Sequence, residues 1–354
     1  TIFNMKIAII IANPEMGGAQ RVGMNLAYWL QDNGNEVCII GITKTNNPSY
    51  SFENINYYEL PEGNKIKLLR SKVKAFAPEI VLSMGVPLSI YTVPACIGLE
   101  LKHVISERND PSNFAGKLST KIIARSLMHF ADAYVFQTRD AQKYYGGRIA
   151  RKSVIIPNPL FNESRMPAQS YSGERRKIIV NVGRLNKQKN HTLLLMAFKA
   201  IKDKYPDYNL VIWGEGKERE TIQNYINQEG LNDRVTLPGN TDAVINKIYD
   251  NALFVLSSDF EGMPNALMEA MALGLPCIST ECPCGGPSEL ISNYENGILV
   301  PVGNKEQMIK AISYLLDNQD EAEKMGRNAQ TIRKHYSIDS ICNRWYSYFR
   351  TLIQ

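Results

Sequence analysis

The chain has 354 residues, of which 44% are hydrophobic and 21% are charged, and its formal net charge is +5. This length predicts two domains, and the composition is ordinary for a globular chain with a core in each half. The apolar run Ile7 to Ala12 is far too short to span a membrane, so no targeting segment is predicted, and no nucleic-acid reader motif accompanies the positive charge.

The six cysteines and four histidines form no pattern that is typical of a metal site or a disulfide framework. No Cys-x-x-Cys pair occurs, Cys282-Pro-Cys284 is too tight for a zinc knuckle, and the histidines are scattered. We therefore expect reduced thiols and no metal ion.

Positive charge is concentrated in the first half of the chain. Residues 1–160 contain 18 Lys and Arg against 12 Asp and Glu, a net charge of +6. The cations are densest at 65–74 and 117–152. They are either solvated helix faces or a surface that attracts an anionic membrane or a lipid-linked diphosphate.

The first half alternates short apolar runs with longer amphipathic stretches such as Arg21–Leu30 and Lys117–Phe130. This alternation predicts a mostly parallel sheet with helices on both faces. The expected strands are Lys6–Ile11, Glu36–Ile42, Ile80–Ser83, Val104–Ser106, Ala133–Phe136 and Ser153–Ile156.

Two prolines around Asn158 predict a domain boundary, and the polar stretch Gln169–Arg176 predicts a flexible connector. The same alternation then restarts. The expected strands are Lys177–Val182, Asn209–Trp213, Arg234–Leu237, Ala252–Ser257, Pro276–Ser279 and Gly297–Val300, and three helices follow at Lys305–Leu316, Asp320–His335 and Ile338–Leu352.

Glycines and polar side chains gather where predicted strands end, which is the edge of an open α/β sheet where ligands bind. In the first half these are Gly17-Gly18, before a helix, and Glu107-Arg108-Asn109. In the second half they are Gly183-Arg184 with Lys189, Gly214, Asn240 and Gly285-Gly286. Taken alone, each could be a tight turn or a solvated loop.

The run from Ala252 to Pro276 combines a buried strand, a turn and a helix that is expected to begin at Pro264. Glu261 lies in the turn and Glu269 lies eight positions later, inside the helix. Both carboxylates could face one crevice and accept hydrogen bonds from sugar hydroxyls, or they could be a loop charge and a solvated helix residue.

The stretch Glu261-Gly262-Met263-Pro264-Asn265, followed by Glu269, resembles the Glu-x7-Glu signature of retaining nucleotide-sugar glycosyltransferases of the GT-B fold. It is most similar to family 4, the glycosyl transferases group 1. The resemblance implies that Glu261 and the backbone after it contact the transferred sugar, and that Glu269 binds the ribose.

The other loops also resemble this family, and the likeness is strongest from about residue 180 to 301. It implies that Arg184 and Lys189 neutralise the donor diphosphate, with Gly17, Gly18 and Gly183 nearby. Gly214 would lie under the base, and the segment with Asn240 would read uracil.

Two positions depart from the family pattern. Gln20 stands where Glu is usual, and Arg108 stands where many members carry a His that is thought to touch the sugar. An arginine is a permanent cation that could hold a phosphate or a carboxylate, or it could form an ion pair with Glu107 or Asp110.

The resemblance implies a fold of two Rossmann-like domains facing a cleft. Residues 1–160 would bind the acceptor, residues 161–336 would bind the nucleotide sugar, and residues 337–354 would form a helix that packs back on the first domain. The catalytic residues would be Arg184, Lys189 and Glu261, with no metal and no cofactor besides the substrate UDP-sugar.

The expected function is therefore a retaining, metal-independent hexosyltransferase. It would move a hexose or N-acetylhexosamine from a UDP-sugar to a glycan acceptor, such as a polyprenyl-diphosphate-linked bacterial intermediate. The expected location is cytoplasmic, on the inner face of the membrane. The alternatives are a nucleotide-sugar epimerase or hydrolase on the same fold, or a non-catalytic nucleotide-sugar binder.

Overall fold

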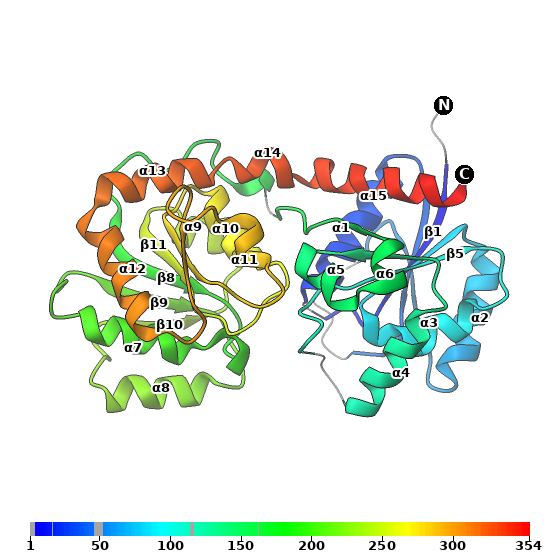
Figure 1. Ribbon diagram of the computed structural model, residues 1–354, viewed down its shortest axis with the longest axis horizontal. Coiled ribbons are helices and arrows are strands. Elements are labelled where there is room, and N and C mark those ends of the chain that lie inside the picture. Colours follow the sequence, from blue (N-terminus) through cyan, green and yellow to red (C-terminus); the bar gives the residue numbers. More distant parts are fainter. Residues whose placement is uncertain (1–3, 16, 46–51, 114–116, 162) are drawn as a thin grey trace. The chain divides into compact units, whose positions relative to one another are not determined.

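The structure is a computed structural model that describes residues 4–15, 17–45, 52–113, 117–161 and 163–354. The chain divides into two compact units (Figure 1). Unit 1 comprises Thr1–Pro159 and Ile338–Gln354, and unit 2 comprises Leu160–Ser337. Within the described ranges, no helix combines the length and the apolar character needed to cross a membrane.

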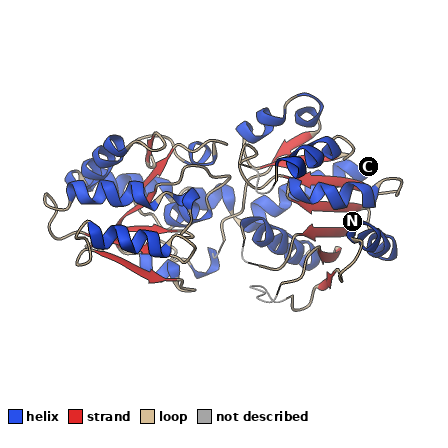
Figure 2. Ribbon diagram, turned by 90° about the horizontal axis from the view of Figure 1, so that it is seen from below, coloured by secondary structure: helices blue, strands red, loops and turns tan. Residues whose placement is uncertain are grey.

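Unit 1 is a seven-stranded parallel sheet in the order β3-β2-β1-β4-β5-β6-β7. Its central strands are continuous apolar runs because helices cover both faces of the sheet (Figure 2). The strands are β1 (Lys6–Ile11), β2 (Glu36–Gly41), β3 (Asn56–Glu59), β4 (Ile80–Met84), β5 (Lys102–Ser106), β6 (Ala133–Phe136) and β7 (Ser153–Ile155).

The helices of unit 1 connect consecutive strands, except for the last one. They are α1 (Gly18–Asp32), α2 (Lys65–Phe76), the 3-10 turn η1 (Val86–Leu88), α3 (Ser89–Cys96), α4 (Leu118–Met128), α5 (Arg139–Tyr145), α6 (Gly147–Arg151) and α15 (Ile338–Ile353). The terminal helix α15 packs against α1, where the Trp29 indole N–H donates to Asp339 at 2.8 Å.

Unit 2 is a six-stranded parallel sheet in the order β10-β9-β8-β11-β12-β13. The strands are β8 (Arg176–Val182), β9 (Asn209–Trp213), β10 (Val235–Gly239), β11 (Asn251–Leu256), β12 (Cys277–Thr280) and β13 (Ile298–Val300). Alternate residues of the central strands enter two separate cores: Ile179 and Leu253 pack on one face, and Val180 and Phe254 on the other.

The helices of unit 2 cover both faces of its sheet (Figure 2). They are α7 (His191–Ile201), α8 (Arg219–Gln228), α9 (Val244–Ile248), α10 (Asn265–Ala272), α11 (Gly286–Leu290), α12 (Lys305–Asp317), α13 (Gln319–Ala329) and α14 (Ile332–Tyr336), with 3-10 turns η2 (Glu163–Arg165) and η3 (Lys187–Lys189).

The strands agree with the predicted ones to within two residues at each end, and two details differ. The edge strand β3 was not predicted, because its sequence Asn-Tyr-Tyr-Glu has no apolar run. The predicted connector at 169–176 is wrong, because it lies inside unit 2. There the guanidinium of Arg175 donates to the carbonyls of Tyr249, Asn251 and Gly274.

Candidate active site

Unit 2 has its topological switch point between β8 and β11, because the chain moves outward from β8 to β9 and β10 on one side and to β12 and β13 on the other. Ligands of open α/β sheets bind beyond the carboxyl ends of the strands at such a point. The loop after β8 carries Lys189, and the loop after β11 carries Glu261. The two best candidate side chains therefore lie on the two loops that flank the switch point.

Local capping determines where Lys189 lies. The Asn186 side chain accepts a hydrogen bond from the Lys189 backbone N–H at 3.2 Å and so begins the turn η3. Asn190 then adopts a left-handed conformation, with φ 42°, and its side chain caps α7 by accepting from the Leu193 N–H. These caps hold the lysine in a short rigid turn.

Hydrogen bonds join the β8 loop to the β11 loop. The Asn190 amide donates to Asp259 at 2.6 Å, and the Asp259 N–H donates to the Gln188 carbonyl at 2.8 Å. The Ser257 hydroxyl donates to the Lys189 carbonyl at 2.9 Å. The two loops therefore behave as one preorganised surface.

Lys189 and Glu261 form an ion pair at this surface. The Glu261 side chain is 8% exposed and that of Lys189 is 16% exposed, so most of each charge has lost its water. Glu261 also accepts from the Ser258 hydroxyl at 2.7 Å. A carboxylate this buried needs such partners, since an uncompensated buried charge would cost several kcal/mol.

The segment Gly262 to Asn265 leads from Glu261 into α10. Pro264 is the N-cap residue and the helix begins at Asn265, one residue later than predicted. A Cβ on Gly286 would lie 1.7 Å from the Gly262 carbonyl oxygen, so only glycine allows the β12 loop to approach the β11 loop this closely. Glu269 is buried in α10, at 6% exposure, among apolar neighbours.

The loops after β8, β9 and β10 lie side by side at the same edge of the sheet. The Gly183 N–H donates to the Trp213 carbonyl and the Gly214 N–H donates to the Gly239 carbonyl, both at 2.9 Å. A Cβ on Gly214 would meet the Gly183 oxygen at 1.9 Å. Arg184 and Asn240 are exposed on these loops, so they face solvent and can meet a ligand.

In unit 1, the predicted residues also lie beyond the carboxyl ends of strands. Gly17 is the N-cap of α1, directly after the β1 loop, and Gly18 is the first helical residue. Among the described residues, no side chain caps this helix, and the first backbone N–H groups point out of its N-terminus as in any α-helix. Glu107, Arg108 and Asn109 follow β5.

Arg108 is buried, and its guanidinium is used within unit 1. Its Nε donates to the Ser106 hydroxyl at 2.7 Å, and its Nη1 donates to the Ile156 carbonyl at 3.0 Å and to Asn158 at 3.3 Å. It also stacks on Trp345 of α15, with 5.0 Å to the ring centroid. Burial lowers the pKa of Arg108 to about 9, and the nearby Glu107 opposes that shift.

The Glu107 carboxylate is held in a defined position. It accepts from the backbone N–H groups of Arg108 and Asn109 at 2.9 and 3.1 Å, and from the Tyr145 hydroxyl at 3.1 Å. Burial nevertheless raises the pKa of Glu107 to about 6, and the hydrogen bonds only partly offset this effect. Asp110 instead accepts from Ser112 and Asn113 in its own loop.

The raised pKa of Glu107 predicts how stability depends on pH. The folded-state pKa of Glu107, about 6, lies above the ordinary 4.5. The contribution of this carboxyl group to the free energy of unfolding is therefore fully present below pH 4.5 and is lost as the pH rises through 6. From about pH 4 to 7, the free energy of unfolding of the wild type should fall by about 2 kcal/mol relative to Glu107→Gln. Urea unfolding of both proteins at several pH values measures this difference, and a constant difference would contradict the raised pKa.

Two of these contacts could not be predicted from the sequence, because they join distant segments. Tyr145 reaches Glu107 from α5, and Trp345 reaches Arg108 from α15. The local sequence around Trp345 is rich in aromatic residues, which predicts core packing and gives no sign of a partner for a cation.

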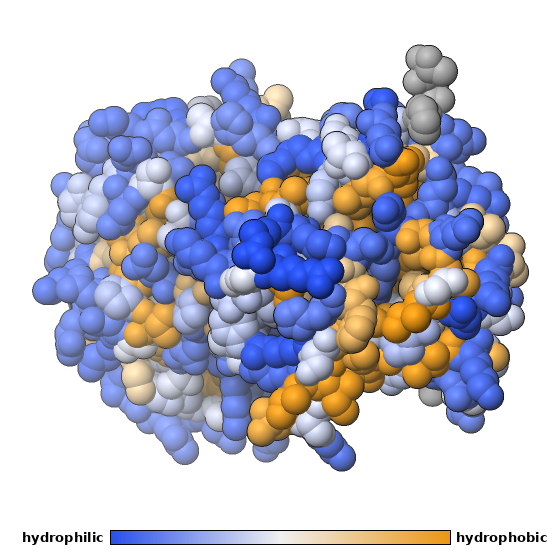
Figure 3. Space-filling model, turned by 45° about the vertical axis from the view of Figure 1, so that its right-hand side comes forward, coloured by the Kyte–Doolittle hydropathy of each residue, from blue (hydrophilic) through white to orange (hydrophobic). Residues whose placement is uncertain are grey.

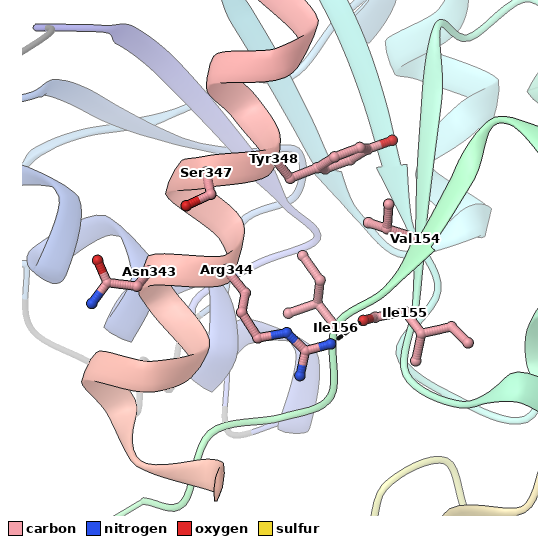
Figure 4. A pocket seen from close by; sticks show the side chains of 7 residues that line it. All are labelled: Val154, Ile155, Ile156, Asn343, Arg344, Ser347 and Tyr348. Atoms are coloured by element: carbon pink, nitrogen blue, oxygen red, sulfur yellow. Dashed lines mark hydrogen bonds between the residues drawn. The ribbon is translucent and has the colours of Figure 1, made fainter.

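A separate hollow of about 380 Å³ lies between β7 and α15 in unit 1 (Figure 4). Its walls are Val154, Ile155, Ile156, Asn343, Arg344, Ser347 and Tyr348. The Arg344 guanidinium donates to the Ile155 carbonyl at one side of it. None of the predicted site residues lines this hollow, so we assign it no part in catalysis. In the described part of the chain, no cluster of three or more His, Cys, Asp or Glu side chains could hold a metal ion.

Comparison with known proteins gives a consistent family. Residues 162–332 match the model of the family "Glycosyl transferases group 1". Over 353 residues the chain is 28% identical to an "Uncharacterized glycosyltransferase" of Haemophilus influenzae, covering 96% of this chain and 98% of that protein. It is 25% identical over 356 residues to the GalNAc-alpha-(1->4)-GalNAc-alpha-(1->3)-diNAcBac-PP-undecaprenol alpha-1,4-N-acetyl-D-galactosaminyltransferase of Campylobacter jejuni, covering 96% and 97%.

Among solved structures, Anabaena Alr3699/HepE in complex with UDP has the same fold. The TM-score is 0.85 at 16% identity, and the match covers 98% of this chain and 100% of that one. The predicted fold class, two Rossmann-like domains, is confirmed.

Proposed function

We propose, from the premise that this chain belongs to the glycosyltransferases of the GT-B fold, that it transfers a hexose or N-acetylhexosamine from a UDP-sugar with retention of configuration and without a metal ion. One observation carries the proposal: the Lys189–Glu261 pair lies at the switch point of unit 2, on two loops that hydrogen bonds hold together. Unit 2 is accordingly the nucleotide-sugar-binding domain, and unit 1 is the acceptor-binding domain.

The leaving group of this reaction is a nucleoside diphosphate whose negative charge grows in the transition state. Positive charge from the protein would stabilise it, and Lys189 and Arg184 carry such charge on the loop after β8. Because Lys189 already pairs with a carboxylate, a diphosphate would share or replace Glu261 as its partner. Glu261 would then be able to orient the sugar hydroxyls.

The remaining donor contacts follow from the loops at the same edge of the sheet. Gly183, Gly214 and Asn240 lie on the loops after β8, β9 and β10, where a base and ribose would lie. Glu269 in α10 would bind the ribose hydroxyls, and the backbone of Gly262, Met263, Pro264 and Asn265 would contact the sugar. Retention needs no covalent nucleophile if the departing phosphate itself accepts the proton of the acceptor hydroxyl.

On unit 1, we assign Glu107, Arg108 and Asn109 to the acceptor or the transferred sugar, and Gly17 and Gly18 to the donor diphosphate. Because the Arg108 guanidinium is bound within the unit, its part would be to position Glu107 and Asn109. The acceptor would be a glycan on a polyprenyl diphosphate, since the Campylobacter jejuni relative is named for such a substrate. The protein would then work at the inner face of the membrane, to which the basic unit 1 would bind.

A ligand that binds only the folded protein raises its melting temperature, by an amount set by its concentration and Kd. We expect UDP and one UDP-sugar to stabilise the purified protein, and UDP release from that sugar to require acceptor. UDP release without acceptor would indicate a hydrolase or epimerase, and stabilisation without any turnover would indicate a binder. No thermal shift with any nucleotide would contradict the proposal.

A further inference from the structure

The helix α4 presents apolar side chains to solvent, which is the reverse of what a helix on a sheet normally does. Leu118 is 71% exposed, Ile122 57%, Ile123 52% and, just after the helix, Phe130 69%. The opposite side of the helix is apolar as well: Ala124 and Met128 are fully buried where α4 packs on α3 and η1. The exposed apolar side chains are therefore additional to those that hold the helix on unit 1.

We call these four exposed side chains the α4 strip: Leu118, Ile122, Ile123 and Phe130. Leu118 and Ile122 are four positions apart, so they share one face of the helix, and Ile123 lies about 100° further around it. Figure 3 shows hydrophobic residues gathered at the lower edge of the molecule in this view. Several large apolar side chains exposed on one short segment are typical of an interaction site.

The charged residues around the α4 strip indicate an anionic partner. From residue 111 to residue 131 the sequence has three cations, Lys117, Lys121 and Arg125, and no acidic residue. Lys117 is exposed at the N-cap of the helix. Exposed Arg139 and Lys143 on α5 add cations, and the Arg125 guanidinium, 4.7 Å from the Tyr144 ring centroid, joins α4 to α5.

Two exposed carboxylates lie near these cations. Asp140 pairs with Lys143 at 3.3 Å, and Asp132 follows Phe130 closely in the chain. Both carboxylates lie outside residues 111–131, so the α4 segment itself has no negative charge. An apolar strip bordered by cations fits a surface that is apolar inside and anionic outside, which is an anionic lipid bilayer.

We propose that α4 lies in the interface of an anionic membrane, with the α4 strip inserted among the acyl chains and Lys117 at the headgroups. An 11-residue helix is about 16 Å long, too short to span a bilayer but long enough to lie in its surface. The proposal deepens the proposed function, on which it rests, because it names the element that holds the enzyme at its lipid-linked acceptor.

Contacts within unit 1 connect this helix to the predicted acceptor residues. The Lys121 ammonium donates to the Ser112 carbonyl at 2.9 Å, and the Arg125 guanidinium donates to the Pro111 carbonyl at 3.1 Å. That loop begins with Glu107, Arg108 and Asn109. A membrane that holds α4 therefore holds the acceptor loop close to the lipid headgroups.

Vesicle flotation tests the proposal with the full chain. We expect the wild type to float with vesicles of phosphatidylcholine and about 30% phosphatidylglycerol, and less with phosphatidylcholine alone or in about 0.5 M KCl. Ile122→Asp/Ile123→Asp should lower the partition coefficient by about tenfold or more, because two apolar insertions are lost and two negative charges are added. The matched control is Met196→Asp, which changes a 41% exposed apolar residue on α7 of unit 2 and should float like the wild type.

Binding of UDP, measured by calorimetry, separates the possible failures. If the double variant floats like the wild type, or if the wild type does not float, the α4 proposal is wrong while UDP binding leaves the proposed function standing. If the wild type floats but binds no nucleotide, the proposed function is the one that fails. A wild-type dimer that the double variant converts to a monomer, without vesicle binding, would assign the strip to a second copy and overturn the proposal.

Discussion

Lys189→Ala is expected to lower kcat/KM for sugar transfer by about 10³-fold, which corresponds to about 4 kcal/mol of transition-state stabilisation. The ammonium lies at the switch point of unit 2, is 16% exposed, and is held by the caps of η3 and α7. A cation with so little surrounding water acts strongly on the charge that develops on a leaving diphosphate. Steady-state kinetics with the donor found in the thermal-shift screen gives the value.

Lys187→Ala is the matched control, because Lys187 lies in the same 3-10 turn and is exposed. It should keep activity within a few-fold of the wild type. Lys189→Ala also leaves Glu261 buried with only neutral partners, so the free energy of unfolding of this variant should fall by about 3 kcal/mol. Both variants must therefore be shown to be folded at the assay temperature.

Glu261→Gln tests the pair from its other side. The amide keeps an acceptor for the Ser258 hydroxyl but removes the charge that Lys189 pairs with. Because the two residues act as a unit, Lys189→Ala/Glu261→Gln should be little slower than the slower single variant. Fully additive losses in kcat/KM, or wild-type rates in either folded single variant, would show that the pair is not the catalytic centre.

An element of this fold could be predicted where its own sequence has a distinctive pattern. Strands buried on both faces are continuous apolar runs, so β1 and β6 were predicted to the residue. The edge strand β3 has no such run and was missed. The long C-terminal pattern at 320–335 was predicted as one helix, but the structure divides it into α13 and α14, with Gln330 and Thr331 between them.

The candidate site was predictable in its positions but not in its pairings. Strand ends placed Lys189 and Glu261 at one edge of the sheet, whereas their ion pair depends on how the loops after β8 and β11 are joined by Asn190 and Asp259. The sequence left Arg108 open between a ligand contact and an ion pair. One partner is the hydroxyl of nearby Ser106. The others are a carbonyl, an amide and an indole ring from distant segments, which no local pattern encodes.

Arg108→Ala is expected to lower the free energy of unfolding by about 3 to 5 kcal/mol. The substitution leaves buried acceptors on Ser106, Ile156 and Asn158 with one donor fewer each, and it opens a cavity against Trp345. Arg108→Lys keeps the positive charge, but an ammonium lacks the planar fork and cannot serve the same acceptors while stacking on the ring. We expect that variant to lose about 2 kcal/mol.

Urea unfolding of both variants measures these losses, with Arg151→Ala as a control on the exposed end of α6 that should change stability by about 0.5 kcal/mol or less. The Arg108 variants should bind UDP as the wild type does while they are folded, because Arg108 is not among the residues assigned to the nucleotide. Among the described residues, the Nη2 atom of Arg108 is buried without a hydrogen-bond partner. If Arg108→Ala unfolds at the wild-type urea concentration but loses transfer, the guanidinium serves a substrate through that atom and not the packing of unit 1.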